Sequence, residues 1–379
     1  GPAVVYLGES AASRQAGFTA DQTLPLEGFT VEVRDRAVAI IGLDRTEFFV
    51  TGPNGAKVKE ELFDSNGTLF GVYDLLERWI GIRWYWPDEE LGTIIPTTQD
   101  LAIPAVRYAD WPVYSYRNLW PESANPDNWS DEGPDPRRHY KRWRYGWGDG
   151  FTVNHSYNFW KDKFTETHPE YFALKKDGTR AIKTALGSDL CYANPAVMKQ
   201  DLENIARFYE TKGQWRGPWG DWVMYPRAGH IAFLPSDCFG GCECPECQRI
   251  AARRGAIAMP ALESQTELIH WYNAAMAAEI QRRWPEKWVI AGAYSEYTLP
   301  PRTVTFPDNV IADVCIMDGI AYHKEPAVWN FWFEVIDQWR ELTGGRPIYI
   351  WHYGCWPQES TKAPVHIPRL LVRWHQAAR

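Results

Sequence analysis

From residue 113 onward, short apolar runs alternate with longer segments of helical spacing. Helical segments lie between several of the runs, most clearly at 195–211 and 259–284. Strands separated by helices are typical of a parallel sheet in which each helix crosses to the next strand. We therefore expect a (β/α)8-type (TIM) barrel over residues 111–379. Only six such runs are present, fewer than the eight strands of a closed barrel, so we expect the barrel to be incomplete at its C-terminus. The runs lie at 113–119, 150–155, 230–235, 288–294, 310–317 and 347–353.

The first 110 residues have a different pattern and predict a small α/β domain. Short β-rich runs at 3–7, 28–33 and 37–41 precede a segment of helical spacing at 67–80, with Asn66 at the N-cap position and Gly81 at the end. A chain of 379 residues also exceeds what one hydrophobic core usually supports. Two domains, 1–110 and 111–379, follow from these observations.

Composition excludes several classes of partner. The net charge is −8 and no Lys/Arg block is present, which argues against nucleic acid and anionic membranes. No apolar run is long enough to span a bilayer. Phosphate-binding loops, His-Glu-x-x-His helices and Gly-x-Ser-x-Gly elbows are also missing from the sequence. These absences weigh against kinases, zinc proteases and lipases.

Aromatic residues make up 15% of the chain, and many stand beside Gly, Pro or charged residues. Flat amphipathic rings beside polar groups suit the CH faces and hydroxyls of a sugar, although large rings also fill protein cores. Reactive residues of parallel barrels follow the strands, and polar or aromatic side chains lie at or after each predicted strand. The candidate substrate-binding residues are Arg117, Trp120, Asn154, His155, Trp160, Tyr294, Tyr297, Asp318, His323, Trp351, His352 and Tyr353.

Glu296 and Asp237 are the candidate catalytic carboxylates. Glycosidic cleavage needs an acid that protonates the leaving oxygen, together with a second carboxylate or a substrate acetamido group. Glu296 follows an apolar run and lies between two Tyr residues, which suits the acid; Asp237 follows the third run. Alternatively, Glu296 is a solvated loop carboxylate and Asp237 caps a turn.

Four of the seven cysteines, Cys238, Cys242, Cys244 and Cys247, crowd into one segment. Four thiolates at such spacing suit a structural Zn²⁺, and a disulfide-stapled loop is equally compatible. Either reading is structural, so we expect catalysis to require no cofactor.

Several longer strings resemble known families. Residues 67–87 (GTLFGVYDLLERWIGIRWYWP) and 92–96 (GTIIP) resemble the N-terminal domain that precedes the barrel in β-hexosaminidases and α-glucuronidases. Residues 168–174 (HPEYFAL), 190–195 (LCYANP) and 242–247 (CECPEC) resemble glycoside hydrolase family 163, formerly a domain-of-unknown-function family. That resemblance implies endo-β-N-acetylglucosaminidase action on complex N-glycans, with retention assisted by the substrate acetamido group. Hexosaminidase-type sites carry adjacent Asp and Glu, whereas Ser295 precedes Glu296 here.

Together these features predict a secreted or periplasmic glycoside hydrolase acting on β-linked N-acetylhexosamine-containing glycans, with an oligosaccharide or glycan as its partner. Glu296 is the expected proton donor, and Asp237 the orienting carboxylate or sugar ligand. Two alternatives remain open. One is a polysaccharide lyase or uronic-acid-processing enzyme, motivated by Arg117 and His155; the other is a non-catalytic glycan-binding protein.

Overall fold

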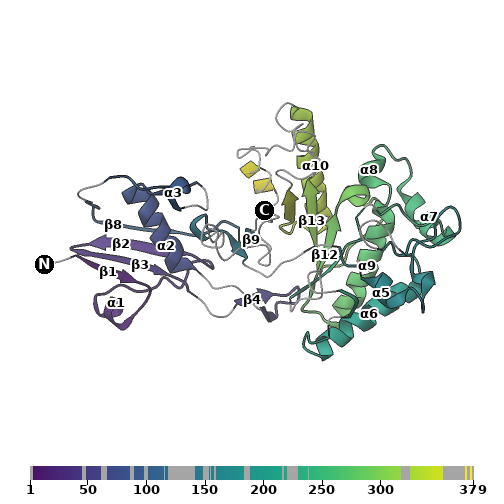
Figure 1. The fold of residues 1–379 in the computed structure, drawn as a ribbon, viewed down its shortest axis with the longest axis horizontal. Helices are drawn as coiled ribbons and strands as arrows, with labels where there is room; N and C mark the ends of the chain where they lie inside the picture. The colour runs from purple at the N-terminus through teal and green to yellow at the C-terminus, as the bar shows by residue number, and fades with distance from the viewer. Residues whose placement is uncertain are drawn as a thin grey trace. The chain divides into compact units, whose positions relative to one another are not determined.

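The computed structural model describes most of the chain and divides it into two compact units, residues 1–50 with 59–151 and residues 51–58 with 152–379 (Figure 1). The boundary expected near residue 110 stays a prediction, because residues 118–140 lie outside the described part. The described residues are 3–44, 48–60, 66–85, 89–97, 101–114, 116–117, 141–147, 153, 155–157, 159–182, 188–215, 217–219, 229–237, 239–316, 325–352, 372–373 and 376–377.

The first unit contains a four-stranded sheet with the order β1-β3-β2-β8. Strand β1 (Val4–Leu7) runs parallel to β3 (Ala37–Gly42), and β2 (Phe29–Arg34) pairs antiparallel with both β3 and β8 (Val106–Asp110). Helix α2 (Gly67–Leu75) packs on this sheet, where its Phe70 is fully buried in a core with Phe29, Val31, Val33 and Ile40. The predicted α/β character of this region is confirmed, and α1 (Ala11–Gln15) follows β1.

The start of α2 differs from the expectation. Asn66 occupies the N-cap position, but its side chain makes no capping hydrogen bond. Asp44 instead accepts the backbone N–H of Thr68 at 2.9 Å, so a carboxylate from the preceding loop pairs the free donor. A Cβ on Gly42 would lie 2.1 Å from the backbone of Gly67, so only glycine permits this close approach. The helix continues as a π turn, Leu76–Ile80, and ends at Gly81 with φ of 84°, as expected.

The second unit is built on a parallel sheet with the order β11-β12-β13-β14. Its strands are β11 (His230–Phe233), β12 (Trp288–Ala293), β13 (Val310–Ile316) and β14 (Tyr349–His352). Helices α9 (Thr266–Arg283) and α10 (Pro326–Leu342) connect consecutive strands, in line with the βα repeats predicted from the sequence (Figure 1). No closed barrel is present among the described residues.

Proline begins four helices of this unit, because its fixed φ suits the first helical position and its missing N–H would be unpaired there. These helices are α6 (Pro195–Glu210), α7 (Pro245–Ala251), α8 (Pro260–Glu263) and α10. The long helix expected over 259–284 is broken at 264–265 into α8 and α9.

The two faces of the parallel sheet differ in chemistry. Alternate residues of β13, from Val310 to Ile316, are buried in the large hydrophobic core beneath the helices. The residues between them include Asp313 and Cys315, which line a pocket on the opposite face. Because successive side chains of a strand point to opposite faces, this alternation places polar groups on the face that a barrel would enclose.

Two of the predicted strands are described only in part. Within the run at 113–119, the described residues include β9 (Tyr116–Arg117), which pairs antiparallel with β10 (Gly146–Trp147) rather than with the parallel sheet. At 150–155, the described residues Val153 and His155 are not in a strand. The neighbouring Ser156 instead donates its backbone N–H to Leu234 at the end of β11. The expected helix at 364–378 lies mostly outside the described residues.

The remaining elements are short. They are β4 (Phe48–Thr51) with β5 (Lys57–Glu60), β6 (Arg83–Trp84) with β7 (Thr93–Ile94), α3 (Glu89–Gly92) and α5 (Trp160–Phe164), plus 3-10 turns at Pro169–Tyr171, Gly217–Trp219, Ala252–Arg254 and Ser295–Tyr297. Among the helices in these ranges, none is long and apolar enough to cross a membrane.

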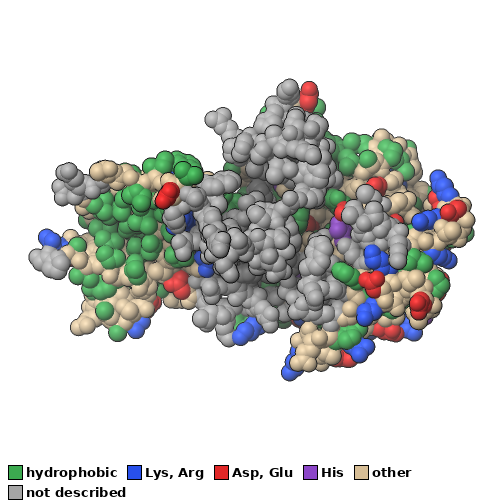
Figure 2. Space-filling model, in the orientation of Figure 1, with side chains coloured by type: hydrophobic (Ala, Val, Ile, Leu, Met, Phe, Trp, Pro, Cys, Tyr) green, Lys and Arg blue, Asp and Glu red, His purple; other side chains and the backbone are tan. Residues whose placement is uncertain are grey.

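Basic and acidic side chains are interspersed over the described surface of the second unit on the face drawn in Figure 2. Two pairs on its helices are Arg249 with Glu246 at 2.5 Å and Arg282 with Glu279 at 2.8 Å. On that face, the described surface of the second unit carries mixed charge rather than one basic patch.

Candidate functional site

The carboxyl ends of β11 to β14 meet at one edge of the parallel sheet, which is where such folds place their sites. A pocket lies there, on the polar face of the sheet. Its lining comes from β12, β13 and β14, from the residues that follow β11 and β12, and from the segment before α5: Val153, His155, Leu234, Gly292, Ala293, Tyr294, Asp313, Cys315 and Trp351. Of the predicted residues, the structure thus brings His155, Tyr294 and Trp351 to one pocket, and Asp237 is bonded to two of them.

His155, Asp237 and Tyr294 form a connected group at this edge. The Nε2 atom of His155 lies 3.0 Å from Oδ1 of Asp237, and Nδ1 lies 2.6 Å from the carbonyl oxygen of Pro235. The hydroxyl of Tyr294 donates to the same Asp237 oxygen at 2.9 Å. Both ring nitrogens of His155 therefore face acceptor oxygens.

Asp237 is held as a carboxylate. The hydrogen bond from His155 lowers the pKa of Asp237 below its ordinary value; burial opposes this shift, and the charge of His155 and the Tyr294 hydrogen bond add smaller lowering contributions. Its side chain keeps 27% of its exposure, so the ionised oxygens stay accessible. The group can accept hydrogen bonds from a ligand or stabilise a positive charge.

Asp189 and Glu296 bring two further carboxyl groups to this end of the unit. Glu296 lies in the 3-10 turn directly after β12. Asp189 is 6% exposed, and Ser188 beside it exchanges two hydrogen bonds with Ser236, one residue before Asp237. Oδ1 of Asp189 and Oε2 of Glu296 are buried and have no hydrogen-bond partner among the described residues.

The ionisation of Asp189 is set mainly by burial, which raises its pKa to about 7. Lys175 opposes this shift, the negative charge of Glu296 adds to it, and a backbone N–H from Gly240 opposes it again. A carboxyl group with such a pKa keeps a proton close to neutral pH, as a general acid must. Asp189 was missed in the sequence analysis, because it follows none of the predicted strands and lies in no recognisable catalytic motif.

Asp313 is a second carboxyl that the sequence analysis missed. It is 7% exposed on β13, lines the pocket, and burial raises its pKa to about 7. A sequence signal was present, since a lone Asp interrupts the apolar run Val310–Ile316. An acidic residue inside a buried strand is seldom structural unless it is paired, so that interruption marks the polar face.

Trp160 and Tyr297 do not stand at a sugar site. Trp160 is fully buried in the core, 4.8 Å centroid to centroid from Phe164, and Tyr297 is 1% exposed. Burial of this degree leaves no ring face for a sugar to stack on, so the stacking role predicted for these two residues is wrong. Trp351 and His352 are half-buried in β14.

Arg117 belongs to the first unit and is already engaged. Its Nη2 lies 2.7 Å from Glu27, and its other nitrogens donate to the carbonyl oxygens of Tyr114 and Arg144. The predicted role of Arg117 in binding a substrate acid conflicts with this pairing. Trp120, Asn154, Asp318, His323 and Tyr353 lie outside the described residues, so their predicted roles stay predictions.

Cys242, Cys244 and Cys247 come together as predicted, and the fourth thiol beside them is Cys191. Cys238 lies outside the described residues. A larger pocket near α8 and α10, lined among others by Met259, Arg302 and Phe331, contains none of the candidate site residues.

The fold and the site define an α/β protein whose second unit carries carboxyl groups at the carboxyl ends of a parallel, helix-connected sheet. The chain belongs to the family described as Domain of unknown function (DUF4838), whose model matches residues 88–358.

Two solved structures share a distant similarity with the chain. One is the chitobiase of Flavobacterium johnsoniae, with 12% identity and a TM-score of 0.40 over 87% of this chain and 47% of that one. The other is the β-N-acetylhexosaminidase of Bacteroides fragilis, with 12% identity and a TM-score of 0.35 over 83% of this chain and 66% of that one. The chain thus spans about half the length of the first and about two thirds of the second. No curated protein matches it.

Proposed function

We propose that the protein is a glycoside hydrolase acting on glycans that contain β-linked N-acetylhexosamine. The observation that carries the proposal is the set of carboxyl groups at the strand ends. Asp189 and Glu296 keep buried oxygens without partners among the described residues. Asp237, at the same end of the second unit, stays ionised. Glycosidic cleavage needs one protonated carboxyl and one anionic group in this way.

Glu296 is the proposed proton donor, since it is the more exposed member of the pair. Asp189, whose pKa is raised to about 7 by burial, keeps a proton near neutral pH. Glu296 would deliver a proton to the leaving oxygen and recover it from water after departure of the aglycone.

Asp237 would act as the anionic group of the site and not as the proton donor. Its carboxylate, oriented by His155 and Tyr294, can accept a hydrogen bond from a substrate amide or support positive charge at the anomeric centre. Trp351 lines the same pocket and offers an apolar ring face.

The finer proposal is endo-β-N-acetylglucosaminidase action on complex N-glycans with acetamido-assisted retention, as in glycoside hydrolase family 163. It is supported by the three strings that carry that resemblance, because they lie together in the structure. Phe172 bridges Leu190, and the backbone N–H of Leu174 lies 3.2 Å from Sγ of Cys242. A secreted or periplasmic location accords with such a substrate.

Replacement of Glu296 by Gln tests the proposal on an aryl N-acetyl-β-glucosaminide and on a released complex N-glycan. Loss of a general acid should lower kcat by about 10²- to 10⁴-fold, with the fold checked by circular dichroism. Glu210→Gln, at an exposed position on α6, is the matched control and should retain full turnover. Unchanged turnover in Glu296→Gln would remove Glu296 from the mechanism. Glycan binding by the wild type without product release would favour a binding protein instead.

The lyase alternative loses one of its two motives, because the Arg117 guanidinium is paired with Glu27. Formation of unsaturated, ultraviolet-absorbing products would restore it.

A further inference from the structure

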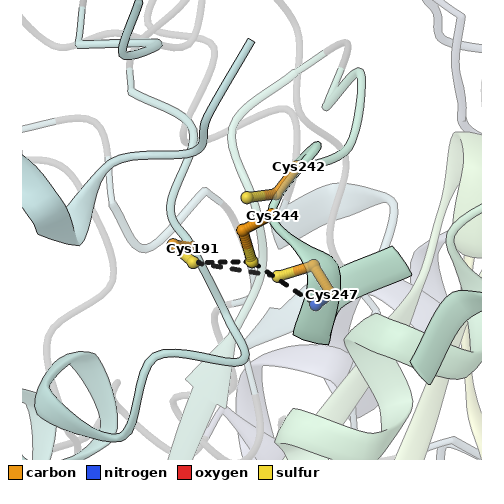
Figure 3. Close-up of side chains that lie close together, drawn as sticks. All are labelled: Cys191, Cys242, Cys244 and Cys247. Atoms are coloured by element: carbon orange, nitrogen blue, oxygen red, sulfur yellow. Dashed lines mark hydrogen bonds between the residues drawn. The ribbon is translucent and has the colours of Figure 1, made fainter. Parts of the chain in front are cut away.

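Four thiols converge in the second unit from two distant segments of the chain. Cys191 follows the bridge residue Leu190, while Cys242 and Cys244 come from the loop that leads into α7 and Cys247 from the first turn of that helix (Figure 3). All four Sγ atoms lie within 4.8 Å of one another. Each of the four is a free thiol, and three are buried.

The spacing of the sulfur atoms fits a tetrahedral metal. Sγ of Cys191 is 3.5 Å from Sγ of Cys244 and 3.8 Å from Sγ of Cys247. Zinc bound to sulfur at about 2.3 Å in a tetrahedron places its ligands about 3.8 Å apart. Disulfide bonding would require two of these sulfurs to approach to about 2.05 Å, whereas Sγ of Cys191 and Sγ of Cys244 are 3.5 Å apart.

We propose that Cys191, Cys242, Cys244 and Cys247 bind one structural zinc ion as four thiolates. The set is closed, since four protein ligands complete the tetrahedron and leave no position for a reactive water. Zinc would therefore hold these segments of the chain together and take no part in bond cleavage.

The surroundings of the thiols suit a buried, negatively charged metal–sulfur group. The backbone N–H of Leu174 donates to Cys242 at 3.2 Å, and that of Cys247 donates to Cys244 at 3.4 Å. Such N–H donors to ligand sulfurs orient the ligands and stabilise their charge. Phe239 and Ile250, both fully buried in the same core, keep water away.

The position of the cluster gives the metal a role in the proposed site, and this part rests on the proposed function. Cys191 lies two residues after Asp189, and Cys242 lies five residues after Asp237. One ion would thus fix the two segments that carry these carboxyl groups, in addition to the hydrogen bonds between Ser188 and Ser236.

Elemental analysis of the purified full chain by plasma mass spectrometry tests the site. We expect about one zinc per chain in the wild type and loss of that zinc in Cys244→Ser, whose ligand is the least buried of the four. Cys315→Ala removes another buried cysteine, one outside the cluster, and should keep the zinc. Thermal unfolding followed by circular dichroism should show a lower Tm for Cys244→Ser and for the chelated wild type than for the zinc-bound protein.

Cobalt provides a readout that does not depend on stability or on turnover. Adding Co²⁺ to chelator-stripped wild type should give the visible bands of tetrahedral cobalt and thiolate-to-cobalt charge transfer in the near ultraviolet. Three results would each overturn the proposal. They are chelator-stripped protein that gives no such bands with Co²⁺, cluster cysteines that resist alkylation until a reductant is added, and purified protein that contains iron in place of zinc. Zinc without glycan hydrolysis would sink the proposed function and leave the metal site standing.

Discussion

Replacing Asp189 by Asn is expected to flatten part of the pH dependence of folding stability. Burial raises the pKa of the Asp189 carboxyl from 3.8 to about 7 in the folded protein. In the unfolded chain the same carboxyl ionises at its ordinary value of about 3.9. Stability contributed by the protonated group is therefore complete below about pH 4 and is lost as the pH rises towards the folded pKa.

The size of the effect follows from that interval. Within it the folded protein holds a proton that the unfolded chain has lost, so each pH unit removes about 1.4 kcal/mol from the free energy of unfolding. From pH 5 to pH 7 the loss is roughly 2 kcal/mol, because the folded carboxyl is itself half ionised at its pKa. Asp201 and Asp313 also have pKa values raised by burial to about 7, but both titrate equally in wild type and variant and cancel in the difference.

Urea unfolding at pH 5, 6, 7 and 8 measures this difference. Relative to wild type, Asp189→Asn should become more stable by roughly 2 kcal/mol between pH 5 and pH 7, while its glycan turnover falls. Asp162→Asn, at an exposed position on α5, should run parallel to the wild type at every pH. If Asp189→Asn also runs parallel, Asp189 ionises normally and cannot keep a proton for the reaction.

Three further substitutions separate structural from ligand-binding roles. Trp160→Ala should lower the free energy of unfolding by about 3–5 kcal/mol, because the indole is fully buried. Trp351→Ala should instead raise KM for a glycan, because Trp351 lines the pocket. Equal effects of the two substitutions on KM would contradict this distinction. Tyr294→Phe removes a donor that lowers the pKa of Asp237, so the acid limb of the kcat/KM profile should move to higher pH, and an unmoved limb would exclude that contact from catalysis. Arg117→Met leaves a buried carboxylate unpaired, so Tm should fall with KM unchanged; a raised KM would return Arg117 to the substrate site.

The sheet of the second unit could be predicted because its strands are local features of the sequence. The runs at 230–235, 288–294, 310–317 and 347–353 each contain one of the four parallel strands. Their apolar residues are buried and the helices between them follow from spacing and from proline at the first turn. Local patterns were also enough to place Asp237 and Glu296 after strands.

The sequence could not predict which distant residues the fold brings together. Cys191 lies 53 residues before Cys244, so no spacing rule links them. Asp189 follows none of the strands predicted from the sequence, and its proposed role depends on burial, which a sequence does not show for a single polar residue. For the same reason Trp160, a core residue, could not be told from a ring that stacks on sugars.

The segment around Asp189 explains how a buried carboxyl can keep an unpaired oxygen. Its backbone is fixed on both sides, since Ala173 donates to the carbonyl of Asp189 at 2.8 Å and Asp189 donates to Ala181 at 3.2 Å. Native proteins seldom leave buried polar atoms unpaired, because each unmet hydrogen bond costs about 1–3 kcal/mol. The backbone hydrogen bonds that keep Oδ1 of Asp189 and Oε2 of Glu296 unpaired therefore hold an arrangement that lowers the stability of the folded protein. Such an arrangement is favoured where a ligand supplies the missing bonds, and this is the physical reason for placing the reaction at these two carboxyls.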